Sequence, residues 1–298
     1  MSSQGISAVD DPTTSKIPHR TGVVGGGTMG SGIAHALLLA GSSVVLLERD
    51  PGAAAQAKAR VYKALDGSVR RGVIDATDEA ASRLNATTRI QDLASAALVV
   101  EAVPEILHIK LETLRAIEDV VNPDAVIGTN TSSMSIDLLA QSLAHPQRLI
   151  GLHFFNPVPA SKLVEVVRGA ATDPTLPETA ASWVRELGKT PVVVRDAPGF
   201  ASSRLGVALG LEAIRMLQEG VASAEDIDAA MTLGYGHPMG PLRLTDLVGL
   251  DVRLGIARYL EQELGPRFAA PELMITMVEQ GRLGRKSGRG FYTWDAAS

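Results

Sequence analysis

A glycine-rich segment near the amino end constrains the fold of this chain more than any other part of the sequence. It follows a short apolar run that ends at Val24 and reads Gly25-Gly26-Gly27-Thr28-Met29-Gly30. Between a strand and a helix, glycines at the first, third and sixth positions permit a tight turn, the approach of backbone to a pyrophosphate, and close helix–strand packing. Residues 31–40 have the composition of a helix, and the amino end of a helix offers unpaired amides to phosphate groups. The segment therefore predicts a dinucleotide-binding loop in a parallel, Rossmann-type sheet.

An acidic residue at the end of the next apolar run indicates which dinucleotide this loop binds. Residues 44–47 are Val-Val-Leu-Leu, and Glu48 follows them, 18 residues after Gly30. A carboxylate at this place accepts hydrogen bonds from the ribose hydroxyls and repels the 2′-phosphate of NADP. Arg49 lies beside it, and a neighbouring arginine can accommodate that phosphate. The sequence thus favours NAD and leaves the strictness of this choice open.

The pattern of apolar runs divides the 298 residues into two regions. Up to Asp196, short apolar runs alternate with helical segments, which is typical of a mostly parallel sheet covered by helices; after it, the periodicity is helical. We therefore expect a flexible tail at 1–20, an NAD-binding Rossmann-type α/β domain at 21–197 and an all-α C-terminal domain at 198–298. The expected strands are 23–24, 44–48, 98–103, 125–128, 150–155, 163–167 and 191–194, and the expected helices of the first domain are 31–40, 51–70, 107–120 and 179–187.

Composition argues against several classes of function. The formal net charge of −5 is unlike that of a general nucleic-acid-binding protein, which usually carries a basic excess. The chain has no cysteine, so it forms no disulfide, catalytic thiolate or zinc–thiolate centre, and we expect no metal. No apolar run reaches the ~18 residues that cross a bilayer, and the first residues lack a secretory signal. We expect a cytoplasmic protein with neither nucleic acid nor membrane as a partner.

A histidine and a glutamate far from the glycine loop are candidates for proton transfer. His153 lies in the apolar run 150–155, and Glu165 interrupts the apolar run 163–167. Burying a carboxylate without a partner is costly, so a glutamate inside such a run implies a partner. Histidine is a suitable base because its unperturbed pKa is about 6.5, and a carboxylate can fix the proton on its second nitrogen. From the residues alone, a purely structural histidine and a pairing of Glu165 with Lys162 remain open.

Together these segments resemble the L-3-hydroxyacyl-CoA dehydrogenase family, and within it the short-chain 3-hydroxybutyryl-CoA dehydrogenases. The resemblance extends from about Thr21 to Trp294. It implies a Rossmann-type domain followed by a helical one, NAD as cofactor, and oxidation of a 3-hydroxyacyl-CoA ester by hydride transfer. Besides the glycine loop, it rests on six motifs in the same order along the chain: Val100–Glu105, Thr129–Ser133, Gly151–Val158, Asp196–Phe200, Gly234–Pro241 and Lys286–Tyr292.

The resemblance implies roles for four residues near the reacting atoms. His153 is expected to remove the 3-hydroxyl proton while hydride leaves C3, and Glu165 is expected to orient this base and stabilise its charge. Ser132 is expected to hydrogen-bond the substrate oxygen near the nicotinamide ribose, which makes it a contact of both substrate and cofactor. Asn156 is expected to shape the same pocket.

Other residues are implied as cofactor or substrate contacts. Glu105, Lys110 and Lys286 match positions that reach the nicotinamide half of the cofactor. Ser203 is expected to contact substrate, but it stands where the family often has asparagine, so it keeps a hydroxyl and loses an amide and some reach. Lys58 is a candidate contact for the nucleotide end of coenzyme A, with an ordinary solvated helix face as the alternative.

The sequence therefore favours an NAD-dependent dehydrogenase of short L-3-hydroxyacyl-CoA esters that forms a homodimer through its C-terminal helices. One alternative keeps the fold and the histidine–glutamate pair but acts on a free 3-hydroxy acid or alcohol, as carnitine and gulonate dehydrogenases do. A second alternative is a non-catalytic NAD-binding structural protein, against which the presence of Ser132, His153 and Glu165 argues.

Overall fold

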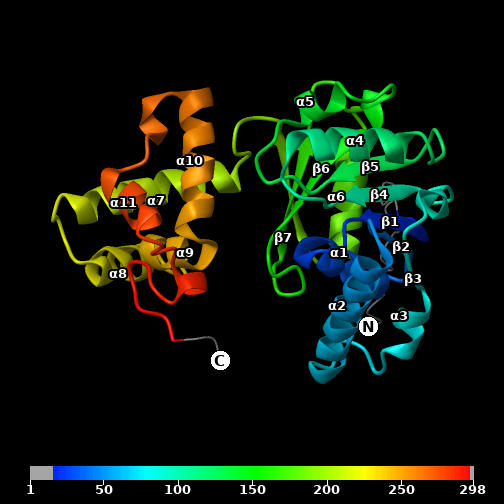
Figure 1. Cartoon of the computed structure of the whole chain (residues 1–298), viewed down its shortest axis with the longest axis horizontal. Coiled ribbons are helices and arrows are strands. Elements are labelled where there is room, and N and C mark those ends of the chain that lie inside the picture. The colour runs from blue at the N-terminus through cyan, green and yellow to red at the C-terminus, as the bar shows by residue number, and fades with distance from the viewer. Residues whose placement is uncertain (1–15, 296–298) are drawn as a thin grey trace, which may run out of the picture. The chain divides into compact units, whose positions relative to one another are not determined.

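The computed structural model describes residues 16–295, which form two compact units. The first unit ends at Asp196 and the second begins at Ala197. Figure 1 shows a sheet with helices in the first unit and helices alone in the second. Within residues 16–295, every helix is too short or too polar to cross a bilayer.

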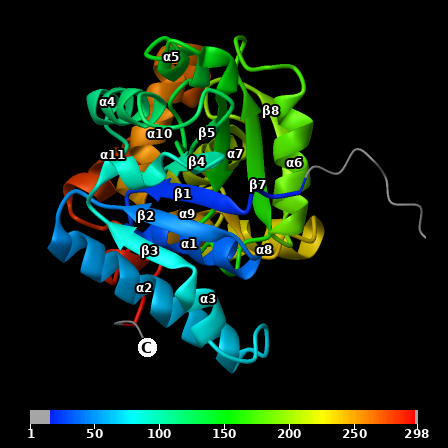
Figure 2. The ribbon, with the colours of Figure 1, turned by 90° about the vertical axis from the view of Figure 1, so that its right-hand side faces the viewer.

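The first unit is built on one eight-stranded sheet with the order β3-β2-β1-β4-β5-β6-β7-β8. Neighbouring strands are parallel, except that β6 and β7 are antiparallel. Figure 2 shows β4, β1, β2 and β3 side by side. The expected mostly parallel, Rossmann-type sheet is thereby confirmed. The strands are β1 (Arg20–Val24), β2 (Ser43–Leu47), β3 (Leu84–Thr87), β4 (Leu98–Glu101), β5 (Val126–Thr129), β6 (Leu149–Phe154), β7 (Leu163–Arg168) and β8 (Thr190–Arg195).

Helices cover the sheet because its central strands carry mostly apolar side chains on both faces. All four residues of β4 and all six residues of β6 are buried. The longest covering helix begins after Asp50, whose side chain accepts a hydrogen bond from Ala53 N at 2.8 Å and so satisfies an amide of the first turn. The helical segments are α1 (Thr28–Leu39), α2 (Pro51–Arg70), α3 (Asp78–Ser82), η1 (Ile90–Leu93), α4 (Leu107–Glu118), α5 (Ile136–Ala140), η2 (Pro146–Arg148) and α6 (Leu176–Glu186).

The edge strand β3 is the main element that the sequence pattern does not predict. Its residues, Leu-Asn-Ala-Thr, form no continuous apolar run. None of the four is fully buried, because β3 has a neighbour on one side only. An edge strand therefore lacks the hydrophobic signal that identifies the central strands.

Of the flexible tail expected at 1–20, the structure describes residues 16–20. Residues 1–15 lie outside the described residues. Residues 16–20 are bound to the first unit, because the Lys16 carbonyl accepts a hydrogen bond from Trp183 Nε1 at 3.1 Å and the Pro18 carbonyl accepts one from Ser42 Oγ at 2.8 Å. The prediction of flexibility is therefore wrong for these five residues, which lead directly into β1.

The described residues of the second unit are helical, with isolated bridges near the C-terminal end. Ser223 caps α8 by accepting a hydrogen bond from Asp226 N at 3.1 Å, as its position before an acidic pair predicts. The buried Asp246 fixes the last segment, since it accepts hydrogen bonds from Tyr292 N at 3.0 Å and Trp294 Nε1 at 2.8 Å. The segments are α7 (Ser202–Gln218), α8 (Ala224–Gly234), α9 (Pro241–Val248), α10 (Leu250–Leu264), η3 (Pro266–Phe268), α11 (Glu272–Glu279) and η4 (Arg285–Ser287).

Candidate active site

Candidate functional residues of the first unit gather at the edge of the sheet where the parallel strands end. The register places Val24, Glu101, Thr129 and Gly151 side by side on β1, β4, β5 and β6. β1 lies beside β4 although two strands separate them in the sequence, so the connections leave this point in opposite directions. Ligands of open α/β sheets bind at such a point, outside the carboxyl ends of the strands.

The glycine loop has the backbone geometry that a bound pyrophosphate requires. Gly25 has φ +93°, and a Cβ on Gly30 would come within 1.7 Å of the Gly25 carbonyl oxygen, so both positions need glycine for the turn itself. A Cβ on Gly27 would meet nothing within 4 Å. Protein packing therefore does not require glycine there, whereas close approach of a phosphate does. Gly27 is also the N-cap of α1, and no side chain caps the amides of its first turn. The loop thus fits NAD.

A pocket of about 790 Å³ lies against this loop. Glu48 lies at its wall, and Glu48 Oε1 accepts a hydrogen bond from Gly26 N at 2.7 Å. The Arg49 side chain is 87% exposed and pairs with Asp50 at 3.0 Å. The group fixed at the pocket is therefore the carboxylate, which suits ribose hydroxyls. The lining includes Gly25, Gly27, Thr28, Met29, Leu47, Glu48 and Arg49.

His153 and Glu165 lie opposite each other on the antiparallel strands β6 and β7. The distance from His153 Nδ1 to Glu165 Oε2 is 2.8 Å. The histidine is 5% exposed and the glutamate 0% exposed, so the pair is desolvated. The Phe155 ring lies 4.4 Å from the imidazole, centroid to centroid. A carboxylate at Nδ1 holds the proton there and selects the tautomer in which Nε2 carries the lone pair.

The loop after β5 is held by Glu105. Glu105 Oε1 accepts hydrogen bonds from Thr131 Oγ1 at 2.6 Å and from Ser132 N at 2.9 Å. Burial alone would raise the pKa of Glu105, but the charge of Lys110 and the hydrogen bonds from Thr131 and Ser132 outweigh it and hold this pKa below its usual value. An ionised Glu105 therefore fixes the backbone of Ser132. No described residue forms a hydrogen bond with the Ser132 hydroxyl.

Lys110 is buried between two carboxylates. Its side chain is 1% exposed, and its ammonium lies 2.8 Å from Glu101 Oε1 and 3.2 Å from Glu105 Oε2. Thr129 Oγ1 donates to Glu101 Oε2 at 2.6 Å. The lysine thus joins the ends of β4 and β5 to the start of α4, and in the described structure its charge is compensated by the protein.

Sequence reasoning did not select Glu101, Thr129 or Asn130 as part of the site. Glu101 interrupts the apolar run 98–103, which is the same signal that identified Glu165. Asn130 Oδ1 accepts a hydrogen bond from Phe154 N at 2.9 Å and so joins the ends of β5 and β6. The predicted Asn156 is exposed and lies just beyond β6.

Of the three remaining predicted residues, one is on α2 and two belong to the second unit. Lys58 is exposed on α2, with Nζ 5.4 Å from the centroid of the Tyr62 ring, and it does not line the pocket at the glycine loop. Ser203 lies in the first turn of α7 in the second unit. Lys286, also in the second unit, pairs with Asp251 at 2.6 Å.

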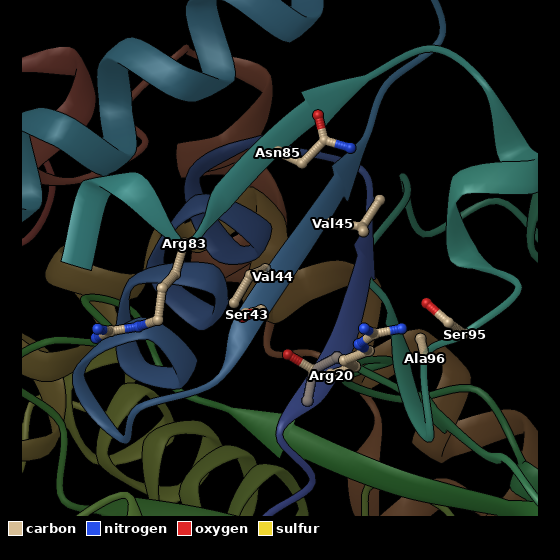
Figure 3. A pocket seen from close by; sticks show the side chains of 9 residues that line it. Arg20, Ser43, Val44, Val45, Arg83, Asn85, Ser95 and Ala96 are labelled. Atoms are coloured by element: carbon tan, nitrogen blue, oxygen red, sulfur yellow. The ribbon is translucent and has the colours of Figure 1, made fainter. Parts of the chain in front are cut away.

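At the amino ends of the strands, opposite the candidate site, lies a smaller hollow of about 150 Å³. Figure 3 shows its side chains, which come from the amino ends of β1, β2 and β3 and from the segment before β4. None of the predicted site residues lines it. In open α/β sheets, ligands bind outside the carboxyl ends of the strands and not at their amino ends.

The comparisons with known proteins cover nearly the whole chain. The family described as "3-hydroxyacyl-CoA dehydrogenase, NAD binding domain" matches residues 20–197, and the corresponding "C-terminal domain" matches 199–294. A 3-hydroxybutyryl-CoA dehydrogenase of Mycobacterium tuberculosis is 44% identical over 92% of this chain and 98% of its own length. A 3-hydroxyadipyl-CoA dehydrogenase of Escherichia coli is 40% identical over 92% of this chain and 58% of its own length. The crystal structure of (S)-3-hydroxybutyryl-CoA dehydrogenase from Ralstonia eutropha matches 93% of this chain and 99% of its own with a TM-score of 0.89 and 38% identity.

Proposed function

This chain belongs to the 3-hydroxyacyl-CoA dehydrogenase family, and we propose that it oxidises short L-3-hydroxyacyl-CoA esters such as 3-hydroxybutyryl-CoA. It is an NAD-dependent oxidoreductase, as its matching NAD-binding domain indicates. The product is the 3-ketoacyl-CoA ester. The observation that carries the proposed alcohol oxidation is the buried contact of 2.8 Å between His153 Nδ1 and Glu165 Oε2, and the choice of CoA esters is supported by the similarity to 3-hydroxybutyryl-CoA dehydrogenases.

His153 acts as the general base in the proposed reaction. When bound, NAD accepts the hydride that leaves C3 of the substrate. His153 Nε2 takes the proton of the 3-hydroxyl group in the same step, so that the C3–O bond becomes a carbonyl. Glu165 keeps the Nδ1 proton in place and stabilises the imidazolium that forms. Because the glutamate is fully buried, its charge acts on the imidazole with little screening by solvent.

Ser132 directs the substrate oxygen in this proposal. Glu105 fixes the Ser132 backbone at 2.9 Å, so the hydroxyl extends from a rigid position. A hydroxyl there donates a hydrogen bond to the developing carbonyl oxygen, and such preorganised donors contribute strongly in a water-poor site. Lys110 contacts both Glu105 and the buried Glu101 and so holds Glu105 in place. Asn156 lines the same pocket in this proposal.

An NADH-oxidation assay tests the proposed function. Acetoacetyl-CoA and longer 3-ketoacyl-CoA esters are compared with free acetoacetate and with 3-dehydrocarnitine. We expect rapid turnover of the CoA esters and little turnover of the free acids. Turnover confined to a free acid contradicts the proposal and favours the free-acid dehydrogenase. No turnover of any of these substrates contradicts it and favours a non-catalytic NAD-binding protein.

We further propose that the enzyme is a cytoplasmic homodimer formed through its C-terminal helices. Because the chain has no cysteine, it forms no disulfide and needs no oxidising compartment, which is consistent with the cytoplasm. Apolar side chains are exposed on three helices that pack together: Leu205 on α7 is 70% exposed, Val248 on α9 42% and Val252 on α10 44%. Light scattering after gel filtration tests the dimer. A monomer of the wild-type protein at micromolar concentration contradicts it.

A further inference from the structure

The connection between β6 and β7 carries the candidate proton-transfer pair near its two ends. Residues 155–162 join the two strands and are called the β6–β7 loop below. His153 is the last residue but one of β6, and Glu165 is the third residue of β7. Because the pair is fixed internally by the pairing of the two strands, the position of the β6–β7 loop decides where the pair lies relative to the rest of the first unit.

Lys189 holds the β6–β7 loop. It lies between α6 and β8, and its side chain is partly buried. Its ammonium donates hydrogen bonds to the Val158 carbonyl and to the Ser161 carbonyl, both at 2.6 Å. The backbone of the lysine is held in turn, since Lys189 N donates to the Val184 carbonyl of α6 at 3.1 Å. The lysine therefore ties the loop to the end of α6.

The β6–β7 loop packs against the helix that follows the glycine loop. Val158 is 2% exposed, and a Cβ on Gly32 of α1 would lie 2.8 Å from Val158 Cβ. Glycine thus allows an approach of the two segments that a larger residue would prevent. Ser31, the residue before Gly32, donates a hydrogen bond from Oγ to the Gly26 carbonyl at 2.7 Å. The loop that carries the proton-transfer pair is therefore in contact with the helix that holds the glycine loop.

The charge of Lys189 is compensated by carbonyl groups. Among residues 16–295, no carboxylate lies within ion-pair distance of its ammonium, whereas the buried Lys110 contacts two carboxylates. Burial lowers the pKa of Lys189, because taking a charge out of water is unfavourable unless hydrogen bonds compensate it. An apolar side chain would avoid this cost but would not hold two carbonyls. The lysine is therefore suited to fixing the loop rather than to filling space.

We propose that Lys189 is a positioning residue for the dehydrogenase reaction, because it holds the β6–β7 loop against α1 and so sets the place of His153 and Glu165 relative to the glycine loop. This inference rests on the proposed function. Without the lysine, the pair stays intact on its two strands and the glycine loop stays intact on α1, but the two shift relative to each other. Transfer of a proton and a hydride in one step requires both groups in place, and a misplacement of about 1 Å costs about 10²-fold in rate.

The test begins with Lys189→Met, which removes the ammonium and keeps an unbranched side chain. We expect kcat for acetoacetyl-CoA with NADH to fall about 10- to 100-fold. The Kd of NADH, measured by fluorescence titration, should stay within about twofold of the wild-type value, since the glycine loop keeps its own contacts. Lys189→Arg keeps the charge and the donors and should recover part of kcat. Lys162→Met is the matched control, because Lys162 is an exposed lysine of the same loop, and it should leave kcat unchanged.

Two further variants separate positioning from a general structural role. Gly32→Ala keeps the lysine but displaces Val158, so it should also lower kcat. Lys189→Met is then added to His153→Gln. Because residues that act as a unit have non-additive effects, it should change the residual kcat there by less than about threefold. The concentration of folded enzyme is taken from the NADH titration, and if Lys189→Met fails to fold, Gly32→Ala decides.

Three results overturn the inference. The first is a kcat within about twofold of the wild-type value in both Lys189→Met and Gly32→Ala. The second is an equal loss of kcat from Lys189→Met in the wild-type and in the His153→Gln background, which indicates a structural role. The third is a loss of NADH affinity as large as the loss of kcat, because the loop then acts on the cofactor site. Failure of the dehydrogenase function is recognised separately, since the wild-type protein then turns over no acetoacetyl-CoA.

Discussion

Two buried histidines of the first unit differ in the kind of side chain that lies against the imidazole ring. His153 on β6 and His35 on α1 are 5% and 2% exposed, and each has a ring nitrogen 2.8 Å from a side-chain oxygen. The oxygen belongs to the carboxylate of Glu165 in one case and to the hydroxyl of Ser68 in the other. A carboxylate compensates the charge of an imidazolium, whereas a hydroxyl does not.

The pKa of His35 shows what burial without a carboxylate does. Burial, assisted by the charges of Arg71 and Lys189, lowers the pKa of His35 to about 4. This histidine is therefore neutral throughout the physiological range and serves packing between α1 and α2. Burial alone makes a histidine structural, and a carboxylate partner is what suits it to proton transfer.

Replacing each histidine in turn tests this difference most strongly. His153→Gln removes the proton-transferring group, and we expect kcat for acetoacetyl-CoA to fall about 10³-fold or more. The affinity for NADH, measured by fluorescence titration, should barely change. His35→Gln is the control and should keep kcat within about twofold, since it lies outside the site. Near-normal turnover in His153→Gln would remove the catalytic role.

The pH dependence of stability distinguishes the histidines next. The pKa of His35 in the folded state, about 4, is below its unfolded value of about 6.5, so the unfolded chain binds the proton first as pH falls. Stability from neutral His35 is complete above pH 6.5 and is lost toward pH 4, by about 3 kcal/mol in all. Urea unfolding of the wild type and of His35→Gln between pH 7 and 4 measures this. Equal pH slopes in the two proteins would contradict it.

Changing the carboxylate tests its role directly. Glu165→Gln keeps a hydrogen-bonding group of the same size but removes the charge, and we expect kcat to fall about 10- to 100-fold. Glu178→Gln, at an exposed position on α6, is the matched control. If both variants have the same kcat, the charge of Glu165 does not contribute to the reaction.

The smallest expected effect concerns the Ser68 hydroxyl, which contacts His35. Ser68→Ala leaves a buried ring nitrogen of His35 without its partner and should lower the free energy of unfolding by about 1–2 kcal/mol, with no change in kcat. Ser95→Ala, at an exposed position, serves as the control for stability. A loss of activity in Ser68→Ala would show that this pair, too, affects the site.

Several features of the site followed from the sequence because they depend on local structure. The glycine loop and Glu48 were predictable, since their spacing reflects backbone geometry over fewer than 30 residues. Glu165 was predictable because a carboxylate in an apolar run implies a partner. The same reasoning applies to Glu101, which also interrupts an apolar run. Its partner Lys110 lies on a helix, and nothing in the sequence around Lys110 indicates that this lysine is buried.

The sequence by itself determined the alternation of strands and helices, the loop for a dinucleotide and the residue types available for proton transfer. These depend on local sterics and on which residues leave water. Only the tertiary structure decided which charges meet: β6 and β7 run antiparallel, so His153 faces Glu165, and Lys110 acquires two carboxylates. Such pairings depend on strand order and on packing between segments distant in the chain, and these emerge only from the balance of contacts over the whole fold.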